Sequence, residues 1–451
     1  MPIPSDAGRR RPPGEATLSE PSYRARRETA LAFLQAGDAE AALREFRWAL
    51  WYPRRLPADE LADGLGVLAR IMAALGQREL AERAAHASVD PLDPDGLYDL
   101  GYQLLDEGLP AIAATVLGRC LELVPGSEEV VTELVVALER QLAHGDARRL
   151  LDAHPALLEA SFLCRYLRAF NAAMSGDLAT TRADLPRLLP VEATHDAMVE
   201  RIAAIVARAD RAAGCRLDAT DLRGWHHVLT GGLLLHLSPH GFDEGMHGRY
   251  AWLQDSWALL RHGLVRLRAV LATWGVAPPC VYAPPGRDHE AVGEAAARLL
   301  GLPRSPWPAI GVPAPGLVVA YDLASVERRD LERLLERRPD QVLYAHATGW
   351  TEDGAIAADV TNLLCQSLVA PWEPQLVIDP EQGAARTGAP DPRPAEELGA
   401  AIAEAAALSA DDVARDDEPG LLALAGALGP PAPGRRERAW AGGPVSSNRF
   451  Q

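Results

Sequence analysis

The sequence predicts an N-terminal array of helical hairpins followed by a doubly wound, mostly parallel α/β domain. Three observations lead to this prediction. Glycines in turn-like contexts recur at intervals of 39, 32, 37 and 31 residues before residue 215. After residue 215, short apolar runs alternate with longer amphipathic stretches. The composition, with 48% hydrophobic and 24% charged residues, is that of a globular protein.

The recurring glycines mark the turns of successive helix pairs. They are Gly37, Gly76, Gly108, Gly145 and Gly176. A period near 34 residues with one tight turn per unit is typical of stacked helical hairpins. Because one hairpin cannot bury its own apolar face, several must stack. We therefore predict a helical repeat domain over residues 23–215, preceded by a disordered Pro- and Arg-rich arm at 1–22.

Residues around the first turn resemble the tetratricopeptide (TPR) repeat. Ala42, Phe46 and Ala49 follow Gly37 by five, nine and twelve residues, and Pro53 closes the unit. A small residue at the fifth position lets the two helices approach, and the aromatic residue fills the space between hairpins. In the family, the first helices of the hairpins line a concave groove. The resemblance therefore implies a groove for a peptide or protein partner.

The later repeats match this family unevenly. Around Gly108, Leu100-Gly101 precedes the turn, Ala113 follows it by five residues and Pro125 ends the unit. The match around Gly76 is partial. After Gly145 and Gly176, Leu150 and Thr181 stand where a small residue is expected. The resemblance covers about Tyr23 to Pro190, which is under half of the chain.

The repeat spacing places a set of aromatic, aliphatic and arginine side chains on the groove. They are Arg27, Leu31, Arg70, Tyr98, Tyr102, Leu105, Tyr166 and Phe170. Aromatic residues beside arginines suit an extended or helical peptide with acidic groups. The other interpretation is that these side chains pack against neighbouring hairpins.

The second half of the chain is predicted to be a Rossmann-like α/β domain over residues 216–390. The predicted strands are 228–237, 280–283, 317–321, 341–345 and 376–378. The predicted helices are 250–274, 288–300, 326–337 and 355–368. The rest of the chain, 391–451, is an acidic Ala- and Pro-rich tail predicted to be mostly disordered, with helices possible only at 394–408 and 421–428.

Candidate catalytic residues follow the predicted strands, since open parallel sheets bind ligands at the carboxyl ends of their strands. His240 lies in the polar segment 238–249, Asp322 ends a strand, and His346 follows the next one. If the site is functional, these three side chains should meet. Arg249 and Arg287 could bind a phosphate there. The alternative is that segment 238–249 is an ordered structural loop.

The same edge predicts no particular metal or cofactor. His240, Asp243, His247 and His346 have suitable ligand chemistry, but their spacing is not diagnostic. Segment 238–249 is not a G-x-G-x-x-G loop, so a dinucleotide site is not predicted. The cofactor, if there is one, stays unassigned.

Charge and composition exclude several classes of protein. The chain contains no lysine, so its 45 basic residues are all arginine and mechanisms that need a lysine are excluded. A net charge of −17 disfavours nucleic acid as a partner. The first residues lack the apolar core of a signal peptide, no apolar run is long enough for a membrane span, and the five cysteines are widely spaced. We expect a cytoplasmic location without membrane contact.

The sequence favours a scaffold function, in which the TPR-like groove binds a peptide or protein partner. The alternative is an enzyme whose α/β domain binds a small phosphorylated or metal-bound ligand, with the repeats recruiting the substrate. The sequence leaves open whether the second domain is catalytic.

Overall fold

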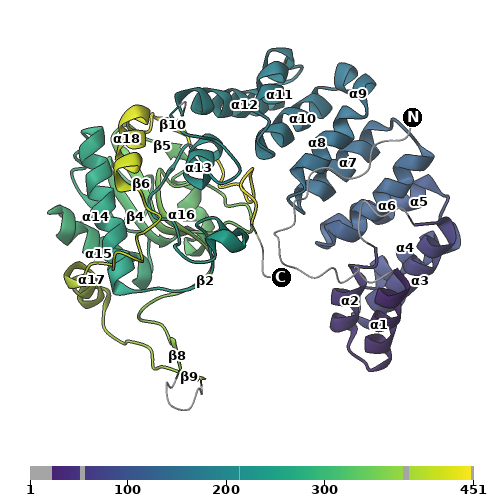
Figure 1. Cartoon of the computed structure of the whole chain (residues 1–451), viewed down its shortest axis with the longest axis horizontal. Helices are drawn as coiled ribbons and strands as arrows, with labels where there is room; N and C mark the ends of the chain where they lie inside the picture. The colour runs from purple at the N-terminus through teal and green to yellow at the C-terminus, as the bar shows by residue number, and fades with distance from the viewer. Residues whose placement is uncertain (1–22, 51–55, 213, 379–384, 448–451) are drawn as a thin grey trace. The chain divides into compact units, whose positions relative to one another are not determined.

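The computed structural model describes residues 23–50, 56–212, 214–378 and 385–447 (Figure 1). The chain divides into two compact units, residues 1–143 and 144–451, each of which is described by itself. This division does not fall at the expected boundary of 215/216, because helices from residue 144 onward group with the sheet. The predicted arm at 1–22 and Pro53 lie outside the described residues.

The first unit consists of helices in its described part. They are α1 (Tyr23–Gln35), α2 (Ala39–Phe46), α3 (Ala58–Ala74), α4 (Arg78–Val89), α5 (Pro94–Asp106), α6 (Pro110–Leu123) and α7 (Glu128–Glu139). The first six pack as three consecutive pairs. Gly37, Gly76 and Gly108 occupy the turns with φ of 83°, 80° and 73°. Only glycine adopts this left-handed conformation without a steric penalty, so the glycine spacing marks these turns.

Small residues allow the two helices of a pair to approach closely. A Cβ atom on Gly101 of α5 would lie 2.6 Å from the Leu117 side chain of α6. Ala113, one turn into α6, is fully buried. The Leu100-Gly101 pair and Ala113 therefore have the packing role that the sequence pattern predicts for them.

The fourth predicted turn lies elsewhere than expected. Gly145 is inside α8 (His144–Asp152), whereas Leu142 has the left-handed backbone, with φ of 56°. Leu142 stands 34 residues after Gly108 and 34 before Gly176. The repeat period is thus more regular than the glycines indicate, because leucine occupies one of the turn positions.

The second unit begins with further helices. They are α8, α9 (Pro155–Ala160), α10 (Phe162–Met174), α11 (Leu178–Asp184), α12 (Ala193–Arg211) and α13 (Leu222–Thr230). α10 contacts α8, α9, α11 and α12. Gly176, with φ of 87°, forms the turn between α10 and α11. Among the described helices of the chain, none combines the length and apolar character needed to cross a membrane.

A six-stranded parallel sheet forms the centre of the second unit. Its strands in spatial order are β1 (Leu233–Leu234), β7 (Val360–Val369), β6 (Gln341–Thr348), β4 (Gly316–Asp322) and β3 (Val281–Tyr282). β2 (Tyr250–Gln254) pairs with the later part of β7. The predicted class, helices with a mostly parallel sheet, is therefore present.

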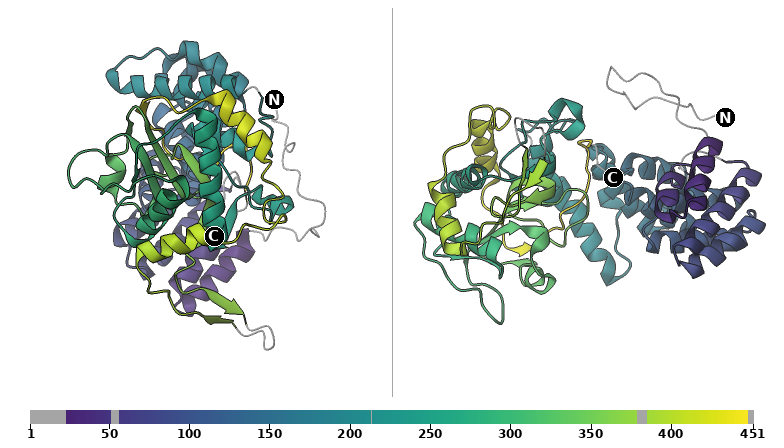
Figure 2. Two further views of the ribbon diagram at one scale, coloured as in Figure 1. Left: turned by 90° about the vertical axis from the view of Figure 1, so that its left-hand side faces the viewer. Right: turned by 90° about the horizontal axis from the view of Figure 1, so that it is seen from below.

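The two faces of the sheet are covered differently. One face packs on α14 (Trp257–Trp274), α15 (Arg287–Leu300), α17 (Ala395–Glu404) and α18 (Glu418–Leu428). The yellow α18 lies beside α14 in Figure 1 and in the left view of Figure 2. The opposite face is covered by η3 (Leu323–Ser325), α16 (Arg328–Glu332), the loop 349–359 and, near β1, α13.

Several predicted elements need correction. The run 228–237 is the end of α13 followed by the short β1, separated by the left-handed Gly231. The run 250–274 is β2 followed by α14, because Ser256 caps a new helix. The predicted helix 355–368 is mostly strand β7, and 326–337 contains the short α16 and β5 (Glu336–Arg337). β8 (Leu376–Ile378) pairs with β9 (Ala385–Thr387) outside the main sheet.

The predicted tail is also corrected, because much of 391–447 is folded against the sheet unit. α17 and α18 pack on one face, and β10 (Gly434–Arg435) pairs with β5. Arg436, Ala439, Ala441 and Val445 are buried. Charge and proline content suggested disorder, yet tertiary contacts hold this segment.

Candidate functional site

The carboxyl ends of β4 and β6 meet at one edge of the sheet, where Asp322 pairs with Ala347. A cavity of about 390 Å³ lies beyond these ends, and we call it the edge pocket. Its lining residues are Leu323, Ala324, Leu331, Thr348, Gly349, 351–356, Gln366 and Ala439. Ligand pockets occur at such edges and have roughly 300–1,000 Å³ of volume. The edge pocket therefore has the place and the size of a small-ligand site.

The lining of the edge pocket combines an apolar wall with oxygen-rich groups. Leu323, Leu331 and Ile356 supply aliphatic surface. Thr348 and Thr351 supply hydroxyl groups, and Glu352 and Asp353 supply carboxylates. Among the described lining residues there is no arginine or histidine. The pocket is thus anionic, which does not suit a phosphate.

Asp322 lies next to this pocket and acts as a cap. Its Oδ1 accepts a hydrogen bond of 3.0 Å from the backbone N–H of Ala324 in η3. Burial raises the pKa of Asp322 above its ordinary value, although the Ala324 hydrogen bond opposes this change. The predicted acid is therefore at the expected edge, where it shapes the segment that lines the pocket.

His346 is fully buried in β6. Burial raises the pKa of Asp322, and the charge of His346 is one of the effects that oppose this change. Nε2 of His346 lies 2.9 Å from Asp255 Oδ2, and the imidazole ring stacks on Tyr321. The Tyr321 hydroxyl donates to the same carboxylate at 3.2 Å. His346 thus belongs to a buried polar network that is separate from the edge pocket.

His240 does not join either group. It is exposed, and its backbone N–H donates to Ser238 Oγ at 3.2 Å, while Ser238 Oγ donates back to the His240 carbonyl. These bonds form a local turn, which agrees with the interpretation of 238–249 as a structural loop. The side chain of Asp243 lies outside the described residues, and His247 packs edge-on against Phe242. Among the described residues, no hydrogen bond or ring contact joins His240, Asp322 and His346, although the charge of His346 acts on the pKa of Asp322.

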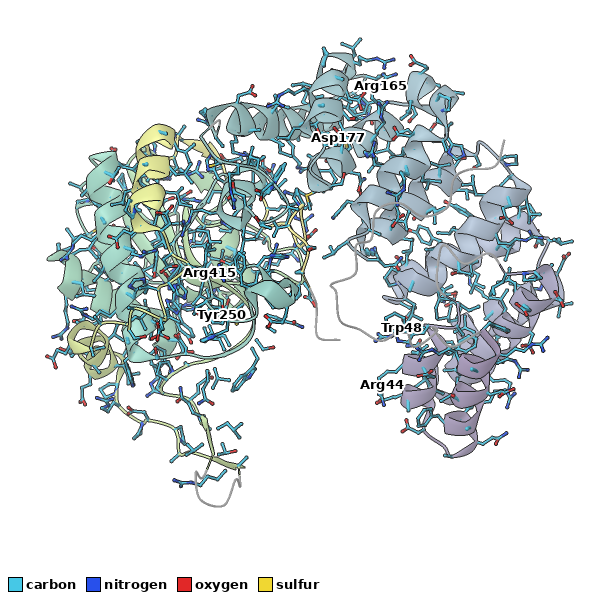
Figure 3. All side chains as sticks on the ribbon, in the orientation of Figure 1. Arg44, Trp48, Arg165, Asp177, Tyr250 and Arg415 are labelled. Carbon is cyan, nitrogen blue, oxygen red and sulfur yellow. The ribbon has the colours of Figure 1, made fainter. Side chains whose placement is uncertain are left out.

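A different histidine–carboxylate cluster forms at the end of β1. Asp416 Oδ2 lies 3.0 Å from His236 Nδ1 and 3.2 Å from His262 Nε2. The backbone N–H of Leu237 donates to the other carboxylate oxygen at 2.8 Å. Burial would raise the pKa of Asp416, but the hydrogen bonds from His236 and His262 lower it overall. Sequence reasoning missed this cluster because Asp416 lies in the segment predicted as a disordered tail. The position of the cluster can be found in Figure 3 from Arg415, the residue before Asp416, which is labelled there.

The cluster of His236, His262 and Asp416 has the ligand types of a transition-metal site. However, Arg266 Nη1 lies 3.2 Å from the same Asp416 Oδ2, and its guanidinium already neutralises the carboxylate. Nε2 of His236 is also occupied, at 2.8 Å from the Tyr250 hydroxyl. A divalent cation would have to displace a buried arginine, so this donor set does not fit a metal. We interpret it as the contact that holds residue 416 to β1 and α14.

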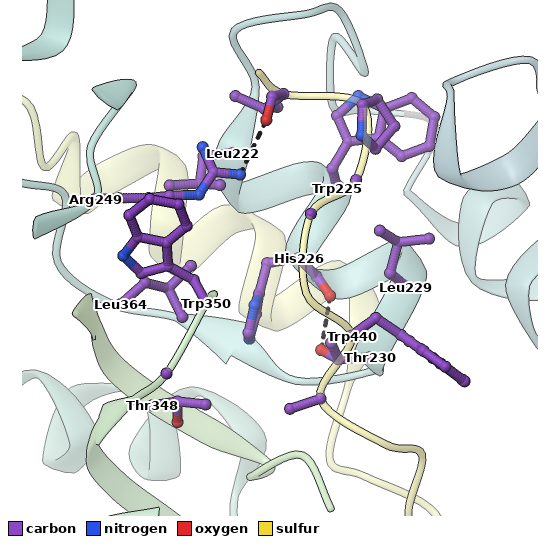
Figure 4. Close-up of a pocket in the computed structure, with 16 residues that line it drawn as sticks. Leu222, Trp225, His226, Leu229, Thr230, Arg249, Thr348, Trp350, Leu364 and Trp440 are labelled. Atoms are coloured by element: carbon purple, nitrogen blue, oxygen red, sulfur yellow. Dashed lines mark hydrogen bonds between the residues drawn. The ribbon is translucent and has the colours of Figure 1, made fainter. Parts of the chain in front are cut away.

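Neither arginine predicted to bind phosphate lines the edge pocket. Arg249 is buried over the ring of Trp350 (Figure 4). It donates to the carbonyls of Val445 and Ser446 at 3.0 and 3.3 Å. Arg287 donates to the carbonyls of Asp391 and Arg393. Both guanidinium groups fix the C-terminal segment, so the expectation of a phosphorylated ligand loses its support.

A smaller cavity of about 40 Å³ lies beside Arg249 and shares Thr348, Gly349 and Ala439 with the edge pocket. Figure 4 shows the imidazole of His226 in it, among Trp225, Trp350 and Trp440. Burial lowers the pKa of His226 to about 3, so the ring is neutral. A cavity of this size can hold water molecules but not an organic ligand.

The predicted groove residues have different environments. In the first unit, Arg27 forms an ion pair with Asp63, while Arg70 and Tyr102 are exposed and Tyr98 is partly exposed. In the second unit, Tyr166 is buried and accepts a hydrogen bond from Arg201. Phe170 and Leu105 are buried as well. Tyr166, Phe170 and Leu105 therefore pack inside the protein, as the alternative interpretation of the groove residues expects.

A scan against models of known protein families and a search of curated proteins found no match to this chain. Any inference about the function of this protein therefore starts from its fold and from two features described above, namely the helical hairpins and the edge pocket.

Proposed function

We propose that the protein is an interaction scaffold whose TPR-like hairpins bind a peptide or protein partner. The observation that carries the proposal is the α5–α7 face, which we define by Tyr98, Tyr102, Glu129 and Glu133. Tyr102 has 49% of its surface exposed. Exposed tyrosines supply large, rigid contact areas, and they are enriched among the residues that dominate binding energy. α5 and α7 are in contact, so their side chains can form one continuous surface.

The charge on this face supports a basic partner. Partial burial and the carboxylates of Glu133 and Glu129 raise the pKa of Tyr98. Burial and Asp106 raise the pKa of Glu133, against the effect of Arg140. Burial is the larger cause of both shifts, and the negative charge beside the tyrosines comes from the carboxylates of Glu129 and Glu133 on α7. The proposed ligand is therefore a peptide with arginine or lysine next to apolar residues, not the acidic peptide expected from Arg27 and Arg70.

Within the described part of the chain, Tyr102 makes no side-chain hydrogen bond, whereas Arg27 is fixed by an internal ion pair. Arg27 is held by Asp63, with Nη2 2.7 Å from Oδ1. The same carboxylate accepts a hydrogen bond of 2.8 Å from the Tyr23 hydroxyl. A side chain that is already fixed within the protein contributes less to binding, so we place the contact at Tyr102 instead of Arg27.

Selection of peptides tests this proposal. Displayed random 16-residue peptides are selected against the full-length chain, and the bound sequences are compared with the starting library. We expect enrichment of net positive charge with at least one large apolar residue. Tyr102→Ala should lower the affinity for a selected peptide by about tenfold or more, as expected for a residue that contributes much of the binding energy of an interface. Glu129→Gln and Glu133→Gln should weaken it less and reduce its dependence on salt.

The matched control is Trp252→Ala, since Trp252 is also exposed but lies on β2 of the second unit. Both variants should unfold at the parent temperature. Enrichment of acidic peptides, or affinities that Tyr102→Ala leaves unchanged, would contradict the proposed face.

A further inference from the structure

We infer that the edge pocket binds a small organic cation, in which a primary amine or guanidinium group is attached to a short apolar chain. This site belongs to the second unit and is independent of the scaffold function proposed for the first. The inference rests on the position of the pocket, on the sign of its charge and on the distribution of its apolar and polar walls.

The position of the pocket is set by the sheet. β4 and β6 are parallel neighbours, with Ala320 opposite Ala345 and Asp322 opposite Ala347. Both strands end at the same edge of the sheet, where β4 continues into η3 and β6 continues into the loop 349–359. Because backbone groups diverge at such an edge, a cavity forms there without any defect in packing. Its volume of about 390 Å³ accommodates a ligand of several non-hydrogen atoms.

The charge of the pocket selects a cation. Glu352 and Asp353 both line it and are exposed, and the described lining contains no basic side chain. Asp353 has a distant ion-pair partner, since Arg438 Nη2 is 3.8 Å from its Oδ2 and Arg438 is half exposed. Exposed pairs at this distance contribute little. The two carboxylates therefore remain able to bind an incoming cationic group.

One contact fixes the carboxylate of Asp353 to the C-terminal segment. Its Oδ1 accepts a hydrogen bond of 2.9 Å from the backbone N–H of Ala441. The bond fixes the carboxylate, and the carboxylate oxygens keep further acceptor capacity. A neighbouring backbone bond, Gly354 N–H to the Ala439 carbonyl at 2.7 Å, holds the same loop to the C-terminal segment. The acidic groups thus stand on a loop that is fixed at two adjacent points.

The remaining lining determines the rest of the ligand. Leu323, Leu331 and Ile356 offer an apolar wall, which suits methylene groups. Thr348 also lines the pocket, and its almost fully buried hydroxyl lies 3.5 Å from that of Thr361. A molecule with one cationic end and a short aliphatic chain matches this combination, whereas a phosphate or a bare sugar does not.

Isothermal titration calorimetry on the full-length chain tests the inference. The probes are agmatine and butylamine as cations, with glucose, inorganic phosphate and magnesium chloride as comparators. We expect heat of binding for at least one cation and none for the comparators. The affinity should fall when sodium chloride is raised, because the carboxylates are solvent-exposed.

Conservative variants locate the binding. The double variant Glu352→Gln with Asp353→Asn keeps the shape of both side chains but removes their charge. It should lower the affinity for the cation by about tenfold or more. Ala324→Trp should obstruct the pocket and abolish binding while the carboxylates remain. The matched control is Glu332→Gln, an exposed acid on the neighbouring α16, which should leave the affinity within twofold of the parent.

The outcomes separate clearly. Cation binding that is lost in both pocket variants and kept in Glu332→Gln supports the site. Binding of glucose, phosphate or magnesium in place of the cations would overturn the assigned ligand class. Absence of heat with both cations, or binding that is unchanged by the pocket variants, would overturn the inference as a whole.

Discussion

Arg436 and Asp359 form an ion pair in which both side chains are fully buried, with Arg436 Nη2 2.9 Å from Asp359 Oδ2. The pair joins the C-terminal segment to the residue that precedes β7. Asp359 also binds Arg337, whose Nη2 is 2.6 Å from Oδ1, and accepts a hydrogen bond of 2.8 Å from the backbone N–H of Leu343. A short C-terminal segment is thus linked by a single carboxylate to the centre of the sheet.

Removal of one partner should therefore destabilise the second unit strongly. Arg436→Met keeps most of the side-chain volume but leaves Asp359 buried with less compensating charge. We expect a loss of about 3–5 kcal/mol in the free energy of unfolding. The measurement is urea unfolding followed by circular dichroism. Arg435→Met, at the exposed neighbouring position, is the control and should change stability by less than about 0.5 kcal/mol.

The same ion pair predicts how stability changes in acid. Burial would raise the pKa of Asp359, but Arg436 and Arg337 lower it overall. The unfolded carboxyl titrates near its ordinary value of about 3.9. The stabilisation is therefore fully present above pH ~4 and is lost as the pH falls through the lower native pKa. Arg436→Met should be less sensitive to acid than the parent between pH ~4 and pH ~2; an equal loss in both proteins would exclude this carboxyl as the cause.

His227 predicts a second effect, at higher pH. Burial, followed by the charges of Arg208 and Arg211, lowers its pKa to about 4. An unfolded histidine has a pKa of about 6.5, so between these values the unfolded chain binds a proton that the native protein does not. Stability should decrease as the pH falls from about 6.5 to about 4, by at most about 3 kcal/mol from this residue.

His227→Gln should reduce that decrease, and unfolding curves at pH 7 and pH 5 measure it. His240→Gln is the control, since His240 is exposed in a loop. If both variants keep the pH dependence of the parent, His227 is not its source.

The parts of the fold that sequence reasoning predicted have local signals. Four of the five predicted hairpin turns carry a glycine that the backbone requires, and β4 and β6 are apolar runs bounded by turn residues. β7 was mistaken for a helix because its first six residues are all buried, which removes the alternation that marks a strand. The left-handed Gly231 ends α13 just before β1, a boundary that the continuous apolar run concealed.

The candidate site was predicted only in part, for a different physical reason. The edge of the sheet and the position of Asp322 follow from strand order. The partners of His236, Arg249 and Asp359 come from residues 416, 445 and 436, which are 77 to 196 positions away along the chain. Pairings at such separations leave no pattern in a single sequence. The carboxylates Glu352 and Asp353 lie between the predicted strand 341–345 and the predicted helix 355–368, and no sequence motif marks them.

The turn at Leu142 offers a test of the repeat period that needs no ligand. Leu142 has a left-handed φ of 56°, whereas Gly145 is helical. A residue with a Cβ is penalised by about 1–2 kcal/mol in the left-handed conformation. Leu142→Gly and Leu142→Ala both remove the leucine side chain beyond Cβ. The difference between their stabilities therefore measures the effect of the remaining Cβ atom on the left-handed backbone. We expect the glycine variant to be more stable by about 1 kcal/mol, measured by thermal unfolding.

At Gly145 the order should reverse, with Gly145→Ala more stable than the parent by about 0.5–1 kcal/mol, because alanine is favoured within a helix. Should alanine be the better residue at 142 and glycine at 145, the turn would lie where the glycine pattern alone predicts it.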